Sequence, residues 1–228
     1  MNLRNVLLML GLILSVTFYG CSSSDSKKAD VKTAPATAPA KPAVDARPII
    51  ACFGDSLTAG FGVDEKENYP HQLQDLLEER GYKYRVVNYG LSGDTTSGGV
   101  ERVAQVLADK PKIVVLELGG NDGLRGLPVT TSTENFEKMI EQFQTTGVKV
   151  ILAGITLPRN YGMDYIHEFD AMYKTLAEKY KVPFIPFLLE GAAMVPDMMQ
   201  KDGIHATGKG NRVVALTVLR KVEPMLTR

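Results

Sequence analysis

The sequence predicts an α/β fold in which a parallel sheet is covered by helices on both faces. From Pro48 to the C-terminus, apolar runs of strand length alternate with amphipathic segments of helical length. The apolar runs are nearly continuous and rich in β-branched residues, which is typical of parallel strands buried on both faces. Three of them end in glycine-rich loops, and right-handed crossover connections bring such loops to one edge of the sheet. Ligands of open parallel sheets bind at that edge.

Each element follows from its own local pattern. The first strand is the apolar run that starts at Pro48 and stops at Gly54. The helix after it carries leucines at helical spacing and stops at Gly81, a natural helix end. A later helix is expected to be capped by Ser132 or Thr133. The expected strands cover residues 48–53, 84–89, 113–118, 148–154 and 182–187. The expected helices cover residues 69–79, 100–109, 133–145, 165–180 and 211–222.

Two segments precede the domain. Residues 1–20 combine an early arginine with an apolar run that is too short for a comfortable membrane span. They resemble a bacterial lipoprotein signal peptide, after which Cys21 becomes the lipidated first residue, although Phe18 stands where such signals usually carry leucine. An uncleaved N-terminal anchor is the alternative. Residues 21–46 form a tether rich in Ala, Pro and Ser that is expected to be disordered. The domain then covers residues 47–228.

Composition limits the classes of function. The chain has 26 basic and 26 acidic side chains, and this balance argues against nucleic acid as a partner. Its two cysteines cannot form a disulfide framework. Cys52 lies in a predicted buried strand, where a cysteine is expected to be an inert small apolar residue. No group of His, Cys and Asp has metal-ligand spacing, and no glycine loop matches a phosphate cradle, so neither a metal ion nor a cofactor is expected.

A serine follows the first predicted strand directly, in the sequence Gly54-Asp55-Ser56. A serine at the ligand-binding edge of a parallel sheet is a candidate nucleophile, although serine is also a common loop residue. A serine nucleophile needs a general base, and histidine is the usual one. Whether Ser56 is a nucleophile or an ordinary loop residue therefore depends on whether another part of the chain can supply this base.

The best candidate base is His205, in a polar loop just before the last predicted helix. Asp202 precedes it by three residues, with the permissive Gly203 between them. In a turn, this spacing lets the carboxylate bind one imidazole nitrogen and leaves the other free for Ser56. The aspartate then fixes the tautomer and stabilises the imidazolium. A simple turn with a helix-capping role is the alternative interpretation.

Acyl transfer also needs hydrogen-bond donors for the oxyanion. The backbone N–H of Gly90 can approach a substrate closely because glycine has no Cβ. Asn121 offers a side-chain N–H between glycines, although an Asx-turn role is the alternative. Glu117, in an apolar strand, is interpreted as a structural hydrogen-bonding residue. The loop carboxylates Asp94 and Asp122, like Asp55, are interpreted as bracing or capping groups.

Four groups of residues, in this order along the chain, carry a family resemblance. They are Gly-Asp-Ser-Leu-Thr-Ala-Gly at 54–60, Gly90, Gly-Gly-Asn-Asp at 119–122 and Asp-Gly-Ile-His at 202–205. Through them, the chain from Pro48 onward resembles the SGNH hydrolases, also called the GDSL family. The resemblance implies a flavodoxin-like three-layer α/β/α sandwich with a central five-stranded parallel sheet. It also implies Ser56 as nucleophile and an acid–base pair at Asp202 and His205. The expected oxyanion donors are the N–H groups of Ser56 and Gly90 and the side chain of Asn121.

Within the family, residues 117–127 and 157–162 are most similar to the bacterial thioesterase I/lysophospholipase L1 type and related arylesterases. This implies a serine esterase that hydrolyses acyl esters and thioesters, with a small-molecule or lipid acyl ester as substrate. Ala206 departs from the family, where proline often follows the histidine. The alternatives are a carbohydrate or peptidoglycan O-acetylesterase that uses the same residues, and an inactive surface-binding lipoprotein.

The N-terminal segment adds an expected location. A lipid on Cys21 would hold the domain at a membrane, facing the periplasm. Release into the periplasm is the alternative. We expect the protein to act as a monomer.

Overall fold

A five-stranded sheet forms the centre of the computed structural model, which describes residues 45–228. The strand order is β2-β1-β3-β4-β5, and every neighbouring pair is parallel. The strands are β1 (Ile49–Gly54), β2 (Arg85–Gly90), β3 (Ile113–Glu117), β4 (Lys149–Ala153) and β5 (Phe184–Ile185). β1 lies between β2 and β3, so the loops after these three strands meet at one edge of the sheet. The predicted α/β fold with a five-stranded parallel sheet is confirmed.

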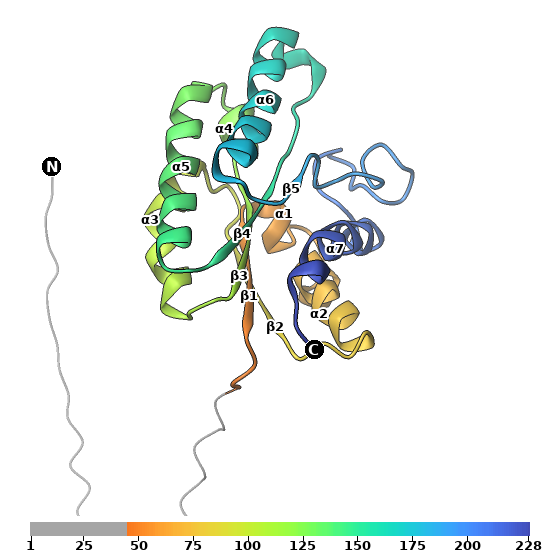
Figure 1. The fold of residues 1–228 in the computed structure, drawn as a ribbon. Coiled ribbons are helices and arrows are strands. Elements are labelled where there is room, and N and C mark those ends of the chain that lie inside the picture. Colours follow the sequence, from red (N-terminus) through yellow and green to blue (C-terminus); the bar gives the residue numbers. More distant parts are fainter. Residues whose placement is uncertain (1–44) are drawn as a thin grey trace, which may run out of the picture. The chain divides into compact units, whose positions relative to one another are not determined.

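Helices cover both faces of the sheet (Figure 1). The helices are α1 (Ser56–Ala59), α2 (Tyr69–Glu79), α3 (Thr96–Ala108), α4 (Gly120–Leu124), α5 (Val129–Thr145), α6 (Met163–Tyr180) and α7 (Gly208–Val222). Short 3-10 turns lie at Glu65–Glu67, Arg159–Tyr161 and Glu223–Met225. α3, α5 and α6 lie side by side on one face, and α2 packs against α7 on the other. This arrangement is the predicted three-layer sandwich.

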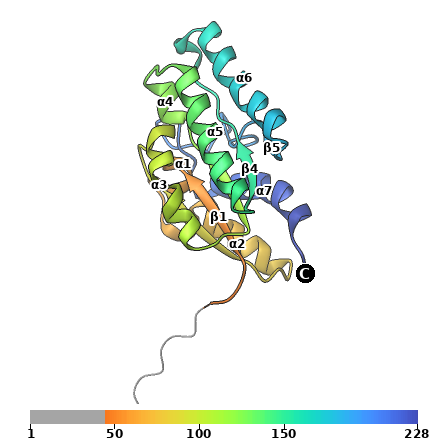
Figure 2. The ribbon, with the colours of Figure 1, turned by 60° about the vertical axis from the view of Figure 1, so that its left-hand side comes forward.

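The core lies on both sides of β1. All six residues of this strand are buried, because helices cover the sheet on either side. Burial raises the pKa of the Cys52 thiol to about 12, which confirms that it behaves as a small apolar residue. Figure 2 shows β1 and β4 running in the same direction, toward α1 and α4. The carboxyl ends of the strands therefore define one edge of the molecule.

Helix starts differ most from the sequence-based expectations. α1 and α4 were not predicted, because four or five residues between glycines carry no helical period. α5 begins at Val129 after Pro128, so neither Ser132 nor Thr133 is its cap. The Ser132 hydroxyl is buried and donates to the Asp122 carboxylate instead, at 3.2 Å. A cap prediction from residue type fails here because a tertiary contact uses the side chain.

Both predicted N-terminal segments, residues 1–20 and 21–46, lie outside the described residues apart from residues 45 and 46. Asp45 accepts hydrogen bonds from the backbone and the guanidinium of Arg47, which itself reaches α2 at Glu78. Within residues 45–228, none of the helices has the length and apolar character needed to cross a membrane.

Candidate active site

Ser56 is the first residue of α1, directly after β1 and the capping residue Asp55. The Asp55 carboxylate accepts the Leu57 N–H at 3.0 Å and so fixes the start of this short helix. Gly54 permits the close approach of strand and helix, because a Cβ there would lie 2.2 Å from Thr58 Oγ1. The strand-end glycine therefore lets the chain turn sharply and present Ser56 at the sheet edge.

The loop before α7 brings His205 and Asp202 to Ser56. His205 Nε2 lies 2.8 Å from Ser56 Oγ, and His205 Nδ1 lies 2.8 Å from Asp202 Oδ2. The second oxygen of Asp202 accepts the backbone N–H groups of Ile204 and His205 at 2.9 and 3.0 Å. The three predicted residues thus form a continuous serine–histidine–aspartate chain, joined across 149 positions of sequence.

Asp202 carries a negative charge beside the imidazole of His205. Partial desolvation raises the pKa of this carboxyl, but hydrogen bonds from the imidazole and two backbone N–H groups outweigh it and lower the pKa to about 2. Asp202 is therefore ionised at neutral pH and favours the tautomer in which His205 Nδ1 carries the proton. In that tautomer Nε2 is free to accept the proton of Ser56. The aromatic ring of Phe61 packs on the imidazole, with centroids 4.6 Å apart.

Asn121 comes from α4, just after β3, and lies beside the same serine. Its Nδ2 atom donates to the Asp94 carbonyl at 2.9 Å and to Asp55 Oδ2 at 3.1 Å. These two bonds fix the orientation of the Asn121 amide, and Asn121 and Ser56 line the same cavity. The structure therefore brings the predicted Asn121 into the site, with its amide held by residues of two other loops.

The predicted donor Gly90 lies elsewhere. Its N–H donates to Asn88 Oδ1 at 2.8 Å, and it does not line the cavity at Ser56. A Cβ at Gly90 would lie 2.1 Å from the backbone nitrogen of Ala59, so this glycine serves the packing of β2 against α1. The prediction that its N–H faces the reacting atoms is corrected on these grounds.

Gly93, which the sequence analysis missed, lines the cavity in its place. It has a φ of +83°, and its N–H has no acceptor within residues 45–228. The Ser56 N–H likewise has no acceptor in this part of the chain. The signal that could have pointed to Gly93 is its place in Ser92-Gly93-Asp94, a sequence suited to a turn with positive φ.

The buried carboxyl group of Glu117 is structural, as predicted. Its Oε2 accepts the Thr58 hydroxyl at 2.8 Å and the Asp55 N–H at 3.4 Å. Its Oε1 is buried without a hydrogen-bond partner among the described residues. Burial and the nearby Asp55 charge raise the pKa of Glu117 well above its usual value. The group ties β3 to the loop that carries Ser56.

The other loop carboxylates brace the site, which confirms their predicted role. Asp94 binds the guanidinium of Arg102 on α3, with the Nε atom 2.9 Å from its Oδ2. Asp122 accepts the Thr96 N–H at 2.9 Å and so holds the start of α3 against α4. The loops after β2 and β3 are thereby fixed to each other.

A cavity of about 180 Å³ opens at the serine. Its lining residues are Ser56, Phe61, Ser92, Gly93, Asn121, Leu124, Ile204 and His205. The chemical groups named above thus face one small space whose remaining walls are largely apolar. Among residues 45–228, no cluster of His, Cys, Asp or Glu has the arrangement of a metal site.

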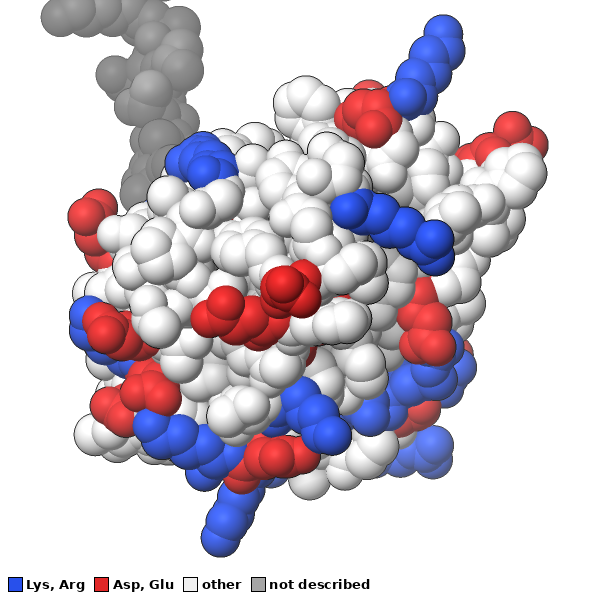
Figure 3. Space-filling view, turned by 90° about the horizontal axis from the view of Figure 1, so that it is seen from above, with Lys and Arg blue, Asp and Glu red and all other residues white. Residues whose placement is uncertain are grey.

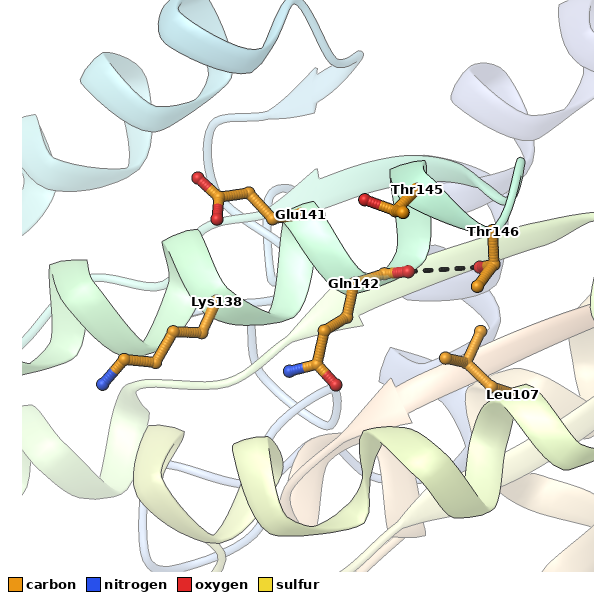
Figure 4. A pocket seen from close by; sticks show the side chains of 6 residues that line it. All are labelled: Leu107, Lys138, Glu141, Gln142, Thr145 and Thr146. Carbon is orange, nitrogen blue, oxygen red and sulfur yellow. Dashed lines mark hydrogen bonds between the residues drawn. The ribbon is translucent and has the colours of Figure 1, made fainter.

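A larger groove of about 520 Å³ lies between α3 and α5 (Figure 4). Lys138, Glu141 and Gln142 of α5 line it together with Leu107 of α3. Gln142 points toward α3, while Glu141 points away from it (Figure 4). The lining residues include no serine, cysteine or histidine. Ser56 and His205 line the smaller cavity instead.

Comparisons with known proteins identify relatives of this chain. A model of the GDSL-like lipase/acylhydrolase family matches residues 52–213. Esterase TesA of Pseudomonas aeruginosa is 46% identical over 153 residues, which are 67% of this chain and 76% of the relative. Thioesterase 1/protease 1/lysophospholipase L1 of Escherichia coli strain K12 is 34% identical over 175 residues, 76% of this chain and 83% of the relative. A crystal structure of TesA superposes with a TM-score of 0.75 at 41% identity, covering 78% of this chain and 99% of the other. The chain therefore belongs to the GDSL-like lipase/acylhydrolase family, the SGNH hydrolases.

Proposed function

We propose that the protein is a serine esterase that hydrolyses acyl esters and thioesters through an acyl-enzyme on Ser56. The observation that carries this proposal is the chain of two 2.8 Å contacts from Ser56 through His205 to Asp202. Ser56 Oγ attacks the acyl carbonyl carbon while His205 Nε2 takes its proton. The bond to the alcohol or thiol then breaks, and His205 returns the proton to the leaving group. Water attacks the acyl-enzyme with His205 again as base, and the carboxylic acid leaves.

The proposed oxyanion donors are the N–H groups of Ser56 and Gly93 and the side chain of Asn121. The two backbone donors have no acceptor within residues 45–228, and Ser56, Gly93 and Asn121 all line the cavity. Asn121 Nδ2 already donates to Asp55 and Asp94, so it must share a hydrogen with the oxyanion. Removing one donor of this kind costs about a hundredfold or more in rate.

The test of the nucleophile is Ser56→Ala, measured with p-nitrophenyl esters and with a fluorophosphonate probe. Hydrolysis is expected to fall to a trace, and the probe is expected to label the wild-type protein only. Ser92→Ala is a suitable control, because Ser92 lines the same cavity and makes no hydrogen bond with the His205 ring. Hydrolysis by Ser56→Ala at the wild-type rate would exclude Ser56 as the nucleophile.

The surroundings of Ser56 support an apolar acyl group. Phe61 and Ile204, which line the cavity, are 52% and 37% exposed. Figure 3 views the molecule from the side toward which the strand ends point. Much of this face is uncharged, a few acidic groups lie near its middle, and basic groups lie mainly toward its rim. The curated relatives are named as an esterase and as a thioesterase and lysophospholipase. We therefore propose that the acyl chain extends along these apolar side chains.

A series of p-nitrophenyl and acyl-CoA substrates of rising chain length tests this specificity. The value of kcat/KM is expected to rise from acetyl to medium-length acyl chains, because each added CH2 covers apolar surface worth about 0.8 kcal/mol when fully buried. Activity confined to acetyl groups would favour an O-acetylesterase instead.

We further propose that the protein is exported, lipidated on Cys21 and held at a membrane facing the periplasm, and that it acts as a monomer. The sequence of the first 21 residues supports the lipid anchor. Because all candidate site residues come from one chain, the proposed reaction needs no second copy. Radiolabelled palmitate is expected on the wild-type protein and not on Cys21→Ser. Equal labelling of both would contradict the anchor.

A further inference from the structure

Gln200 joins the two loops that carry the candidate catalytic residues. Its side-chain Nε2 donates to the carbonyl of Phe61 at 2.7 Å and to the carbonyl of Ala206 at 3.0 Å. Both acceptors are carbonyl oxygens, so the NH2 group of the amide must face them. One side chain therefore connects the turn after α1 with the loop before α7, across 139 positions of sequence.

The backbone of Gln200 closes the loop that carries Asp202 and His205. Its N–H donates to the His205 carbonyl at 2.8 Å, and its own carbonyl accepts the Gly203 N–H at 3.0 Å. Met199, the preceding residue, forms an antiparallel bridge with Ala206. The acid and the base thus lie within a small closed loop that begins at Gln200.

The turn on the other side of this contact is fixed to the serine. The Phe61 N–H donates to the Ser56 carbonyl at 3.0 Å, and the Phe61 ring packs on the imidazole of His205. A Cβ on the neighbouring Gly62 would lie 2.4 Å from Gln200 Oε1, so the glutamine fits closely against this turn. The Gln200 amide therefore links the histidine loop to the turn that is bonded to Ser56.

We infer that Gln200 is a positioning residue, whose amide holds the loop of Asp202 and His205 in register with the turn that follows Ser56. The inference rests on the proposed function, because it concerns the serine–histidine contact of that reaction. Gln200 is not among the residues that line the cavity, so it acts on the reacting groups through the loop. A misplacement of about 1 Å between reacting groups can cost on the order of a hundredfold in rate.

Two substitutions remove the donors of this amide. Gln200→Leu removes both hydrogen bonds, and Gln200→Glu keeps the length and shape of the side chain but has no N–H. The matched control is Gln74→Leu. Gln74 also joins separate elements, donating to the Tyr84 carbonyl at 3.1 Å and accepting the Val86 N–H at 2.7 Å, but it lies on α2 and binds the start of β2. That is the end of the sheet opposite the candidate site.

The measurements are kcat and KM for p-nitrophenyl butyrate, the rate of fluorophosphonate labelling, and thermal unfolding of the full chain. In both Gln200 variants kcat and the labelling rate are expected to fall together by roughly tenfold or more. KM is expected to change by less than about threefold, because Gln200 does not line the cavity. Gln74→Leu is expected to lower the melting temperature while keeping kcat within about twofold of the wild type.

Two outcomes would overturn the inference. The first is a Gln200→Glu protein, or a folded Gln200→Leu protein, whose kcat stays near the wild-type value. The second is a kcat loss in Gln74→Leu as large as that in the Gln200 variants. Such a result would mean that the Gln200 variants lose kcat through general destabilisation of the fold. Failure of the proposed function has a separate signature, since the wild-type protein would then not be labelled at Ser56.

Discussion

Asp55 and Glu117 form a pair of buried carboxyl groups next to the candidate nucleophile. The Asp55 N–H donates to Glu117 Oε2 at 3.4 Å, and the two side chains are 2% and 0% exposed. Burial raises the pKa of both, and each carboxylate disfavours the charge of the other. Asp55 accepts the Leu57 and Asn121 N–H groups, which favour its ionised form. We expect Glu117 to be the member that stays neutral.

Glu117→Gln tests this charge state through the pH dependence of stability. A raised pKa means that the folded protein keeps a proton that the unfolded chain has lost. The stability from this proton is complete below the unfolded pKa of about 4.5 and is lost as pH rises through the folded value. The melting temperature of the wild type is therefore expected to fall relative to Glu117→Gln as pH increases from 5 to 9. Parallel curves over that range would contradict a neutral Glu117.

The residues of the candidate triad could be predicted because their types and order are diagnostic. Ser56 comes directly after a predicted strand, Asp202 and His205 stand in a loop before a predicted helix, and the structure brings the three together. From the sequence alone, the Gly90 N–H was a plausible donor to the oxyanion. The structure shows that this N–H donates to Asn88 Oδ1. Gln200 could not be found, because a glutamine bound to a carbonyl 139 positions away leaves no local pattern.

At the level of elements, the position of α1 depends on its contact with β2. Gly90 lies so close to α1 that an added Cβ would meet the Ala59 nitrogen at 2.1 Å. Neighbouring backbone must therefore move if this glycine gains a side chain. Since α1 begins with Ser56, such a movement also displaces the candidate nucleophile.

Gly90→Ala is expected to destabilise the protein by about 1–3 kcal/mol, the usual range for overpacking in a well-packed site. Chemical denaturation measures this change, and the rate of ester hydrolysis should fall with it. Asn88→Ala is the companion variant, since it removes the acceptor of the Gly90 N–H and leaves the packing intact. Unchanged stability in Gly90→Ala would show that the packing role is misassigned.

The long elements could be predicted and the short ones could not. α2 was expected at residues 69–79 and is observed at Tyr69–Glu79, because its leucines and its ends are both visible in the sequence. β5 covers only Phe184–Ile185, as proline on either side limits strand pairing. α1 and α4 depend on tertiary contacts at the sheet edge, which a local pattern does not contain.

At the level of the whole molecule, residues 45–228 contain every element of the sheet and every residue of the candidate site. Contacts within Val44–Arg228 also define one compact unit. The first β-strand begins at Ile49, next to the Arg47 side chain that binds Asp45 and Glu78. Along the sequence, the contacts that stabilise the folded domain therefore begin within a few residues of Asp45.

A chain that starts at Asp45 is therefore expected to retain the melting temperature and the kcat/KM of the full-length protein on a soluble ester. Thermal unfolding and p-nitrophenyl butyrate hydrolysis of the two chains, compared in the same buffer, provide the measurement. A clearly lower kcat/KM in the shorter chain would show that residues 1–44 contribute to the site.

The 149 positions between Ser56 and His205 also have a consequence for synthesis of the protein. A ribosome-bound chain that already displays the serine cannot cleave esters, because the imidazole has not yet been made. Hydrolysis can begin only after the segment before α7 docks against the first strand, which is a long-range event and therefore slow to form. During refolding, ester hydrolysis should accordingly return later than the helical circular dichroism signal. The return of activity then measures the last step of folding, in which the loop before α7 docks.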